Sequence, residues 1–172
     1  MKKVAAIIFL VLIITLPAFA FNVDVAKVCF SPNGGCTEAI VNQIDNAKSE
    51  ILIQAYSFTS APIAKALVSA HKRGIHVEII LDKSNKSKKY SAGDFTAHMG
   101  VTTYIDSRHA IAHNKIIIID KETVITGSFN FTKAAEEKNA ENLLIIKNKK
   151  LAEIYIDNWN KHKEHSERYE GR

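Results

Sequence analysis

The feature that most constrains the fold is an alternation of amphipathic and apolar segments between residues 37 and 81. Residues 37–48 and 60–73 repeat apolar side chains at helical spacing, whereas residues 50–56 and 75–81 are short, almost wholly apolar runs. An alternating segment at residues 23–30 precedes them and predicts another strand. Strands that alternate with helices through short loops predict βαβ units, with a largely parallel sheet covered by helices on both faces.

The second half of the chain adds antiparallel strands to this plan. The apolar runs at residues 115–119 and 124–126 are separated by a tight turn at Lys121 and Glu122, which predicts two antiparallel strands. The fold class is therefore α/β, with a mixed, mostly parallel sheet sandwiched between helices. The charged tail after Lys163 is expected to fray. The other elements expected here are helices at 90–99, 132–138 and 151–162, and strands at 101–105 and 142–147.

The first 20 residues have the composition of an export signal. Lys2 and Lys3 precede an apolar run over residues 4–16, and Pro17 then leads to the small-x-small sequence at residues 18–20. This pattern predicts a signal peptide cleaved after residue 20, and a periplasmic or secreted mature protein. The alternative is an uncleaved segment that anchors the protein in the inner membrane. No other membrane contact is expected of the mature form.

Residues 21–172 are expected to form one domain, because a chain of this length holds a single hydrophobic core. The whole chain carries 23 basic and 18 acidic residues. Removal of Lys2 and Lys3 leaves 21 basic residues and a net charge of +3. A polyanionic partner would therefore have to be held by local clusters of charge instead of by the overall field.

The two cysteines, Cys29 and Cys36, both lie in the part expected to be exported. An oxidising compartment favours a disulfide between them, and closure of a loop of about eight residues would add roughly 2–3 kcal/mol of stability. Two reduced thiols are the alternative. The sequence lacks the Cys-x-x-Cys spacing that is typical of redox-active pairs.

A set of polar residues surrounds the apolar strand expected at residues 115–119. Written as a pattern, it is His-x-Lys-x4-Asp-x6-Gly-Ser-x-Asn, with a glutamate a short way downstream. Polar residues placed in this way around a core strand indicate a functional site. Its members are His113, Lys115, Asp120, Gly127, Ser128, Asn130 and Glu141.

These side chains suit attack on a phosphodiester. Lys115 offers a positive charge to the nonbridging oxygens, and Ser128 and Asn130 offer neutral hydrogen-bond donors. His113 can attack phosphorus and form a covalent phosphohistidine. Glu141 is expected to hold the other ring nitrogen of His113 and so to select its tautomer.

Two members of the pattern are expected to be structural. Gly127 allows the backbone to turn sharply and to approach a phosphate closely. Asp120 lies a whole strand away from Lys115, at about 3.3 Å per residue, and so is too distant to share the same phosphate. It is expected to serve as an ion-pair or turn residue.

The pattern resembles that of the phospholipase D superfamily. His113, Lys115 and Asp120 match its HxK(x4)D motif, and Gly127, Ser128 and Asn130 match the GSxN sequence that follows. The resemblance extends over residues 23–160, includes the segment AYSFTS at 55–60, and is closest to small secreted bacterial endonucleases with one motif per chain. It implies a mixed αβα sandwich, and phosphodiester cleavage through phosphohistidine without a metal or another cofactor. The paired glutamate of the family falls on Glu141.

A single motif per chain raises a chemical difficulty. An in-line displacement needs a nucleophile on one side of phosphorus and an acid for the leaving oxygen on the other, and one histidine cannot stand on both sides. A homodimer that brings two copies of His113 together is the simplest solution, and the resemblance implies the same assembly. One His113 would attack, while His113 of the partner subunit, protonated, would donate to the leaving group.

The remaining polar and aromatic features have ordinary interpretations beside functional ones. His109 and His113 have the i, i+4 spacing of metal ligands, but no acidic cluster completes a site, so no metal is expected. Residues 83–89, with four lysines, form either a mobile solvated loop or an edge that binds a phosphate backbone. Phe129 and Phe131 either stack on bases or pack in the core. The other histidines, expected to be solvated or structural, are His71, His76, His98, His162 and His165.

The sequence therefore predicts an endonuclease that cleaves DNA with little sequence preference, with RNA left open as a substrate. Its contacts should be made mainly to phosphate, because no groove-reading segment is recognisable. One alternative is a phospholipid phosphodiesterase of the same chemistry. The sequence lacks an evident aromatic-rich amphipathic surface for membrane contact, which argues against this alternative. The other is a noncatalytic nucleic-acid-binding module.

Overall fold

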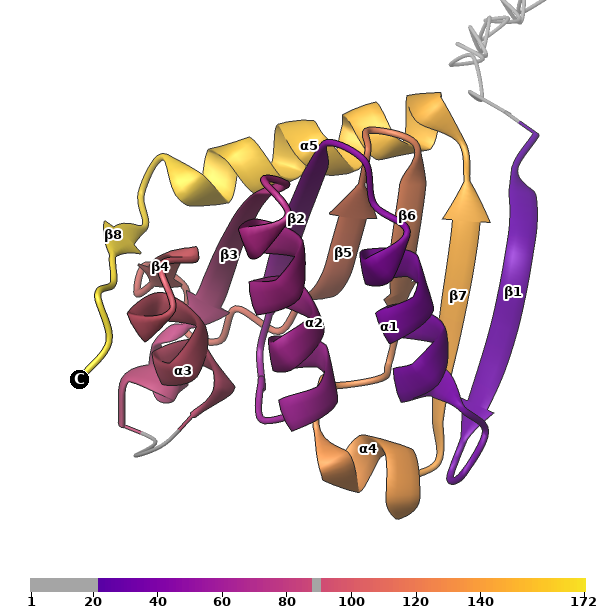
Figure 1. Ribbon diagram of the computed structural model, residues 1–172, viewed down its shortest axis with the longest axis horizontal. Coiled ribbons are helices and arrows are strands. Elements are labelled where there is room, and N and C mark those ends of the chain that lie inside the picture. The colour runs from indigo at the N-terminus through magenta and orange to yellow at the C-terminus, as the bar shows by residue number, and fades with distance from the viewer. Residues whose placement is uncertain (1–21, 88–90) are drawn as a thin grey trace, which may run out of the picture.

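An eight-stranded mixed sheet forms the centre of the molecule (Figure 1). The structure is a computed structural model that describes residues 22–87 and 91–172, so the expected signal segment and residues 88–90 lie outside the described part. The strands follow one another across the sheet in the order β1-β7-β6-β5-β2-β3-β4-β8. Their bounds are β1 Asp24–Ser31, β2 Glu50–Ala55, β3 His76–Asp82, β4 Thr102–Asp106, β5 Lys115–Ile119, β6 Thr123–Gly127, β7 Glu141–Lys147 and β8 Glu167–Arg168.

The mixed sheet between helices is confirmed, but parallel pairings are fewer than expected. Among the strands of the described residues, only the pairs β2–β3 and β3–β4 are parallel. After β4 the chain returns as β5, antiparallel to β2, and β6, β7 and β1 then add to the sheet as further antiparallel neighbours. Helices at residues 61–72 and 92–98 form the crossovers from β2 to β3 and from β3 to β4, so these three strands form the parallel part of the sheet.

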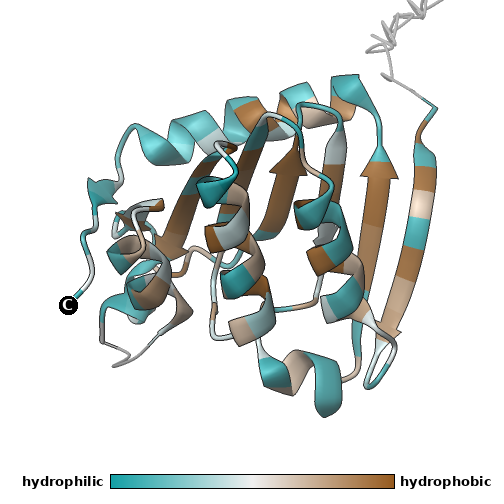
Figure 2. Cartoon of the chain, in the orientation of Figure 1, coloured by the Kyte–Doolittle hydropathy of each residue, from teal (hydrophilic) through white to brown (hydrophobic). Residues whose placement is uncertain are grey.

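Helices cover both faces of the sheet, and the strands are apolar on both sides for that reason. In β5, Ile117 and Ile119 join the core that packs under the helices preceding it in the chain, whereas Ile116 and Ile118 join a second core on the other face. Figure 2 shows the central strands as almost uniformly hydrophobic. The helices are α1 Cys36–Asp45, α2 Ala61–Lys72, α3 Ala92–His98, α4 Lys133–Glu137 and α5 Lys149–Lys163, with a 3-10 turn, η1, at Lys83–Ser87.

The long helix α5 closes the second core. It begins at the cap residue Asn148, whose side chain accepts a hydrogen bond from the Leu151 N–H at 2.9 Å. Trp159 is buried against Leu52 and Ile80, and its Nε1 donates to the Ile53 carbonyl at 2.9 Å. A buried indole thus places its apolar body in the core and satisfies its polar atom on a strand.

The expectation that the chain frays after Lys163 is wrong. β8 pairs antiparallel with the free edge of β4, and the Tyr169 N–H donates to the Thr103 carbonyl at 2.9 Å. The Tyr169 hydroxyl donates to Asp94, and burial together with this carboxylate raises the pKa of Tyr169 to about 12. The charged composition of the tail suggested a solvated segment. The tail is ordered because Tyr169 packs against the domain and because the edge of β4 has backbone groups free to pair with it.

The two cysteines are buried neighbours that the structure presents as free thiols. Burial, followed by the influence of Cys29 and of Glu136, raises the pKa of Cys36 to about 12. The disulfide predicted between Cys29 and Cys36 therefore stays a prediction. Within the described residues, no helix combines the length and apolar character that a membrane span requires.

Candidate active site

The predicted site residues gather at one end of the central strands. Antiparallel neighbours bring the start of one strand beside the end of the next. Lys115 opens β5 and pairs with Ala55, the last residue of β2. Gly127 ends β6, and Glu141 opens β7 beside it. The loop before β5 brings His113 to the same end. Residues separated by nearly 30 positions thus share one surface.

Lys115 is a largely buried cation, with 8% of its surface exposed. Its Nζ donates to the carbonyl of His113 at 2.8 Å and lies 5.2 Å from the centre of the Tyr56 ring. Burial lowers the pKa of Lys115, and the negative charge of Glu141 offsets part of that effect. The strand therefore presents a positive charge, held in one direction, at the end where His113 lies.

His113 is exposed and rests against Tyr56, a residue that the sequence analysis did not select. The two ring centroids are 4.6 Å apart at an angle of 54°. The Tyr56 N–H donates to the Asn114 carbonyl at 2.8 Å, and the Tyr56 carbonyl accepts from Asn85 at 2.8 Å. Tyr56 thus orients both the imidazole and the loop that carries it. The available signal was its position directly after the strand at residues 50–56, within AYSFTS.

Glu141 has different partners from the one predicted. It accepts hydrogen bonds from the Ser128 hydroxyl at 2.6 Å and from the Asn139 amide at 3.0 Å. Within the described chain, no hydrogen bond joins Glu141 to the ring of His113. In a single subunit, Glu141 therefore positions Ser128 and contributes negative charge near Lys115.

Gly127 is required by its backbone conformation and by its closeness to β7. Its φ of 148° lies in the region that favours glycine, and a Cβ there would stand 2.3 Å from the carbonyl oxygen of Asn142. The N–H groups of Ser128 and Phe129 donate to that same oxygen at 3.1 and 3.2 Å. The glycine therefore allows β6 to approach β7 closely, and the close approach to a phosphate stays a prediction.

The segment after Gly127 divides between core and site. Phe129 and Phe131 are 0% and 1% exposed, so both pack in the core and the base-stacking interpretation is wrong. Asn130 lies between them, and its Oδ1 is buried without a hydrogen-bond partner among the described residues. The unused atom is a hydrogen-bond acceptor, so the predicted donation from Asn130 to a phosphate, through its NH2 group, stays a prediction.

Asp120, predicted to be an ion-pair or turn residue, makes hydrogen bonds to the backbone and forms no ion pair among the described residues. Its carboxylate accepts from the N–H groups of Lys48, Ser49 and Glu50 at 2.7–3.1 Å and from the Ser49 hydroxyl at 2.9 Å. Burial by itself would raise the pKa of Asp120, but these hydrogen bonds lower it overall. Asp120 thus joins the end of β5 to the start of β2, at the end of these strands opposite His113.

Part of the lysine-rich segment lies within the described residues. Residues 83–87 form η1, where Lys83 Nζ donates to the His109 carbonyl at 3.0 Å and Lys86 forms an ion pair with Glu167 at 2.9 Å. Both described lysines therefore have partners in the protein. The prediction of a phosphate-binding edge depends on Lys88 and Lys89, which lie outside the described residues.

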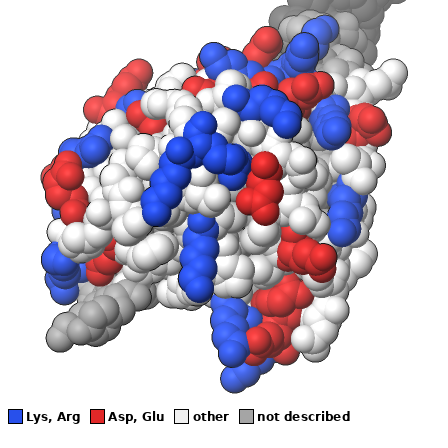
Figure 3. Space-filling view, viewed as in Figure 1, with Lys and Arg blue, Asp and Glu red and all other residues white. Residues whose placement is uncertain are grey.

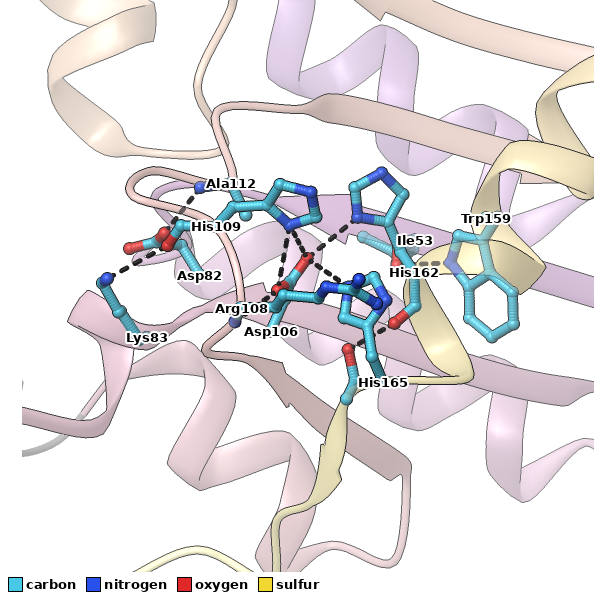
Figure 4. A network of polar contacts seen from close by, with 11 residues as sticks. Ile53, Asp82, Lys83, Asp106, Arg108, His109, Ala112, Trp159, His162 and His165 are labelled. Carbon is cyan, nitrogen blue, oxygen red and sulfur yellow. Dashed lines mark hydrogen bonds and ion pairs between the residues drawn. The ribbon is translucent and has the colours of Figure 1, made fainter.

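Three histidines form a group that was not foreseen as a unit (Figure 4). His109, His162 and His165 surround the buried carboxylate of Asp106, and their ring centroids lie 4.8–5.5 Å apart. Burial would raise the pKa of Asp106, but hydrogen bonds with His162 and His109, together with the ion-pair contact with His165, lower it far below its usual range. The signal in the sequence was a pair of i, i+3 spacings, Asp106/His109 and His162/His165, which only the fold brings together.

A comparison with protein families identifies the class to which this fold and site belong. The family described as cardiolipin synthase, PLD-like domain, matches residues 40–163, which is well over half of the chain. The chain therefore belongs to the phospholipase D superfamily, and it carries a single HKD motif.

Individual relatives agree with this assignment. The chain is 42% identical to Nuc from Salmonella typhimurium, a phospholipase D family member, with a TM-score of 0.81 over 86% of this chain and 99% of that one. NucT from Helicobacter pylori is 25% identical, with a TM-score of 0.76 over 83% and 99% of the two chains. Phospholipase D of Rickettsia conorii is 50% identical over 76% of this chain, which spans 66% of that protein's length.

Proposed function

We propose that the protein is a phosphodiester hydrolase that cleaves DNA through a covalent phosphohistidine, without a metal and with little sequence preference. The observation that carries this proposal is the arrangement at one end of the central strands, where exposed His113 stands beside buried Lys115. His113 supplies a nucleophile that substrate can reach, and Lys115 supplies a positive charge for the phosphate oxygens. The likeness to Nuc over nearly all of its length supports this choice of substrate class, with RNA as a further candidate.

The proposed reaction has two steps. In the first, a ring nitrogen of His113 bonds to phosphorus and the bond to the leaving oxygen breaks, while an acid gives that oxygen a proton. In the second, water attacks the phosphohistidine, gives up a proton to the same group, and releases His113. Lys115 and the side-chain NH2 group of Asn130 stabilise charge on the nonbridging oxygens in both steps, and the Ser128 hydroxyl joins them once its hydrogen bond to Glu141 is broken. Glu141 holds Ser128 and lowers the free energy of the neighbouring Lys115 cation.

The acid is proposed to be His113 of the partner subunit in a homodimer. Two exposed apolar side chains lie at the active-site end of the strands, where a second subunit could cover them. Ile111, 59% exposed, precedes His113 by two positions, and Phe30, 67% exposed, pairs with Asn142 next to Glu141. Exposed apolar residues at such a place fit a subunit contact across the site.

The proposed activity is tested on plasmid DNA in excess EDTA. The protein should nick or degrade the plasmid, and His113→Ala should reduce the rate at least about a thousandfold, because it removes the nucleophile. His76→Ala is a matched control, since His76 is exposed at the opposite end of the parallel strands. Cleavage by His113→Ala at a similar rate, or complete inhibition by EDTA of wild-type protein that circular dichroism shows to be folded, would contradict the mechanism.

A second candidate, phospholipid cleavage, is favoured by the names of some relatives. The matching family is described as cardiolipin synthase, and the Rickettsia conorii relative is named phospholipase D. The face in Figure 3 carries adjacent basic side chains with acidic ones beside them, so its charge favours neither anionic lipid nor DNA. The ratio of kcat/KM on single-stranded DNA to that on cardiolipin vesicles decides between the two. Tight, salt-sensitive DNA binding without turnover of either substrate would favour the noncatalytic module instead.

We further propose export to the periplasm or beyond the cell, with cleavage after residue 20 and a Cys29–Cys36 disulfide. The support is the pattern of the first 20 residues and the adjacency of the two buried thiols. N-terminal sequencing of protein recovered from the periplasm would locate the cleavage. A thiol count on the denatured chain would find none if the disulfide has formed, and two if it has not.

A further inference from the structure

Four potential metal ligands converge from two segments more than 50 positions apart. Asp106 ends β4, and His109 lies in the loop that follows it. His162 lies in the last turn of α5, and His165 follows that helix. One ligand atom from each residue lies within 4.8 Å of all the others. The close-up view shows three imidazole rings directed at a single carboxylate (Figure 4).

The contacts among these groups leave one nitrogen without a good partner. The Oδ2 atom of Asp106 lies 2.8 Å from His162 Nδ1, 2.9 Å from His109 Nδ1 and 3.3 Å from His165 Nε2. Asp106 also accepts from the Arg108 N–H at 3.1 Å. The Nε2 atom of His165 is buried and makes no hydrogen bond among the described residues. The nearest partner of this nitrogen is the Asp106 carboxylate, an ion-pair contact at 3.3 Å and not a hydrogen bond, so the nitrogen points into the cluster with its lone pair available to a metal ion.

We propose that Asp106, His109, His162 and His165 bind one Zn²⁺ ion. Neutral imidazole and carboxylate are ordinary zinc ligands, at about 2.0–2.2 Å from the metal, and four of them form a closed tetrahedral site. Atoms at those distances in a tetrahedron lie about 3.4 Å from one another. The three contacts to Asp106 already approach this value, and the widest separation, up to 4.8 Å, has to close by at most about 1.4 Å.

The surroundings allow both that movement and the entry of an ion. The His109 side chain is 43% exposed, so its ring can rotate without displacing core residues. The site opens into a hollow lined by Arg108, His109, Lys161, His162, Glu164 and His165. The absence of sulfur from the ligand set argues against Cu⁺, and three imidazoles argue against Mg²⁺ and Ca²⁺, which prefer oxygen.

The ion would join the loop that carries His113 to the end of α5. That loop is already held at two points, where the Ala112 N–H donates to Asp82 at 2.8 Å and the His109 carbonyl accepts from Lys83. The end of α5 is held by Lys163, which contacts Glu78 at 2.6 Å. A metal bridge between two anchored segments stabilises the fold and leaves His113 free, so this proposal does not depend on the proposed function.

Zinc binding is tested on tag-free protein that has been treated with EDTA and dialysed. Calorimetric titration with ZnCl2 should give one ion per chain, and Co²⁺ should give the visible absorption of a tetrahedral complex. The double variant His109→Gln/His165→Gln should bind Zn²⁺ at least about tenfold more weakly and lose the Co²⁺ spectrum. It keeps the Asp106–His162 contact, and circular dichroism would verify that it is folded.

Two control variants separate this site from adventitious binding by other histidines. His71→Gln, on α2, and His113→Ala should both bind Zn²⁺ as tightly as the wild type does. Zinc should also raise the Tm of the wild type and of both controls, but not that of the double variant, because it binds only the folded site. Binding of less than one ion per chain, or an equal loss of affinity in a control variant, would overturn the proposal.

Discussion

At the scale of single residues, the site depends on one buried cation. Lys115 is enclosed by β5, by the Tyr56 ring and by the backbone of His113, and the charge of Glu141 partly opposes the effect of burial on its pKa. A lysine so placed loses little entropy when it binds phosphate, because its direction is already set. Its role should therefore be electrostatic and not structural.

Replacement of this cation separates catalysis from stability. Lys115→Met keeps the length of the side chain and should reduce plasmid cleavage by a factor of about 100–1,000, since one charge-stabilising group is lost. The Tm should fall little, because an apolar side chain suits a buried position. Initial rates and thermal unfolding check the two expectations. Lys65→Met, at an exposed position of α2, is the control, and more than a tenth of wild-type activity in Lys115→Met would contradict the assignment.

At the scale of elements, hydrogen bonds to two aspartates hold β5 at both of its ends. At one end, Asp82 accepts from the Ala112 N–H and so fixes the entry to β5. At the other, the Asp120 carboxylate binds three consecutive backbone N–H groups at the start of β2. These contacts prevent β5 from sliding along its axis. They therefore also fix the positions of Lys115, at the start of β5, and of His113 just before it.

The contribution of Asp120 should depend on pH in a defined direction. Its pKa is lower in the folded chain than in the unfolded chain, so its stabilising effect is complete above the unfolded value of about 3.9 and is lost as the pH falls below it. Asp120→Asn should lower the free energy of unfolding by about 1–3 kcal/mol at pH 7. The difference from the wild type should shrink below about pH 4.

Urea unfolding at several pH values measures this difference. Asp157→Asn serves as the control, because Asp157 is exposed on α5 and should show no such change. A gap between wild type and Asp120→Asn that stays constant from pH 7 to pH 3 would mean that the carboxylate charge is not responsible. In that case the packing of the turn, and not its hydrogen bonds, would explain the effect.

At the scale of the whole molecule, the proposed active site belongs to two subunits. If both copies of His113 are required, a dimer with one wild-type and one His113→Ala subunit should be inactive. After full subunit exchange, an equal mixture should retain about one quarter of wild-type activity, since random pairing leaves that share of intact dimers. The same mixture before exchange should retain about one half. Activity of one half after exchange, or a monomeric mass in solution, would contradict the shared site.

The sequence predicted the elements better than their contacts. The strand expected at residues 115–119 coincides with β5, and the one-sided spacing of helix residues located α1 and α2 within a few positions. Several members of the polar motif also lie together in the structure, because they flank adjacent antiparallel strands and are close in the chain. The partner of Glu141 was not predicted, since hydrogen bonds to Ser128 and Asn139 depend on how β6, β7 and the turn before β7 meet.

The features that the sequence could not predict connect segments distant in the chain. The Tyr169 hydroxyl donates a hydrogen bond to Asp94, 75 positions earlier in the chain. The tail, which its charged composition predicted to fray, therefore forms an edge strand. His109, judged beside its neighbour His113, in fact joins Asp106, His162 and His165. Local patterns decide secondary structure and nearby motifs, because hydrophobic periodicity and short-range hydrogen bonds act along the chain. Only the tertiary structure decided the histidine cluster and the last strand, because their contacts form when burial of the apolar core brings remote segments together.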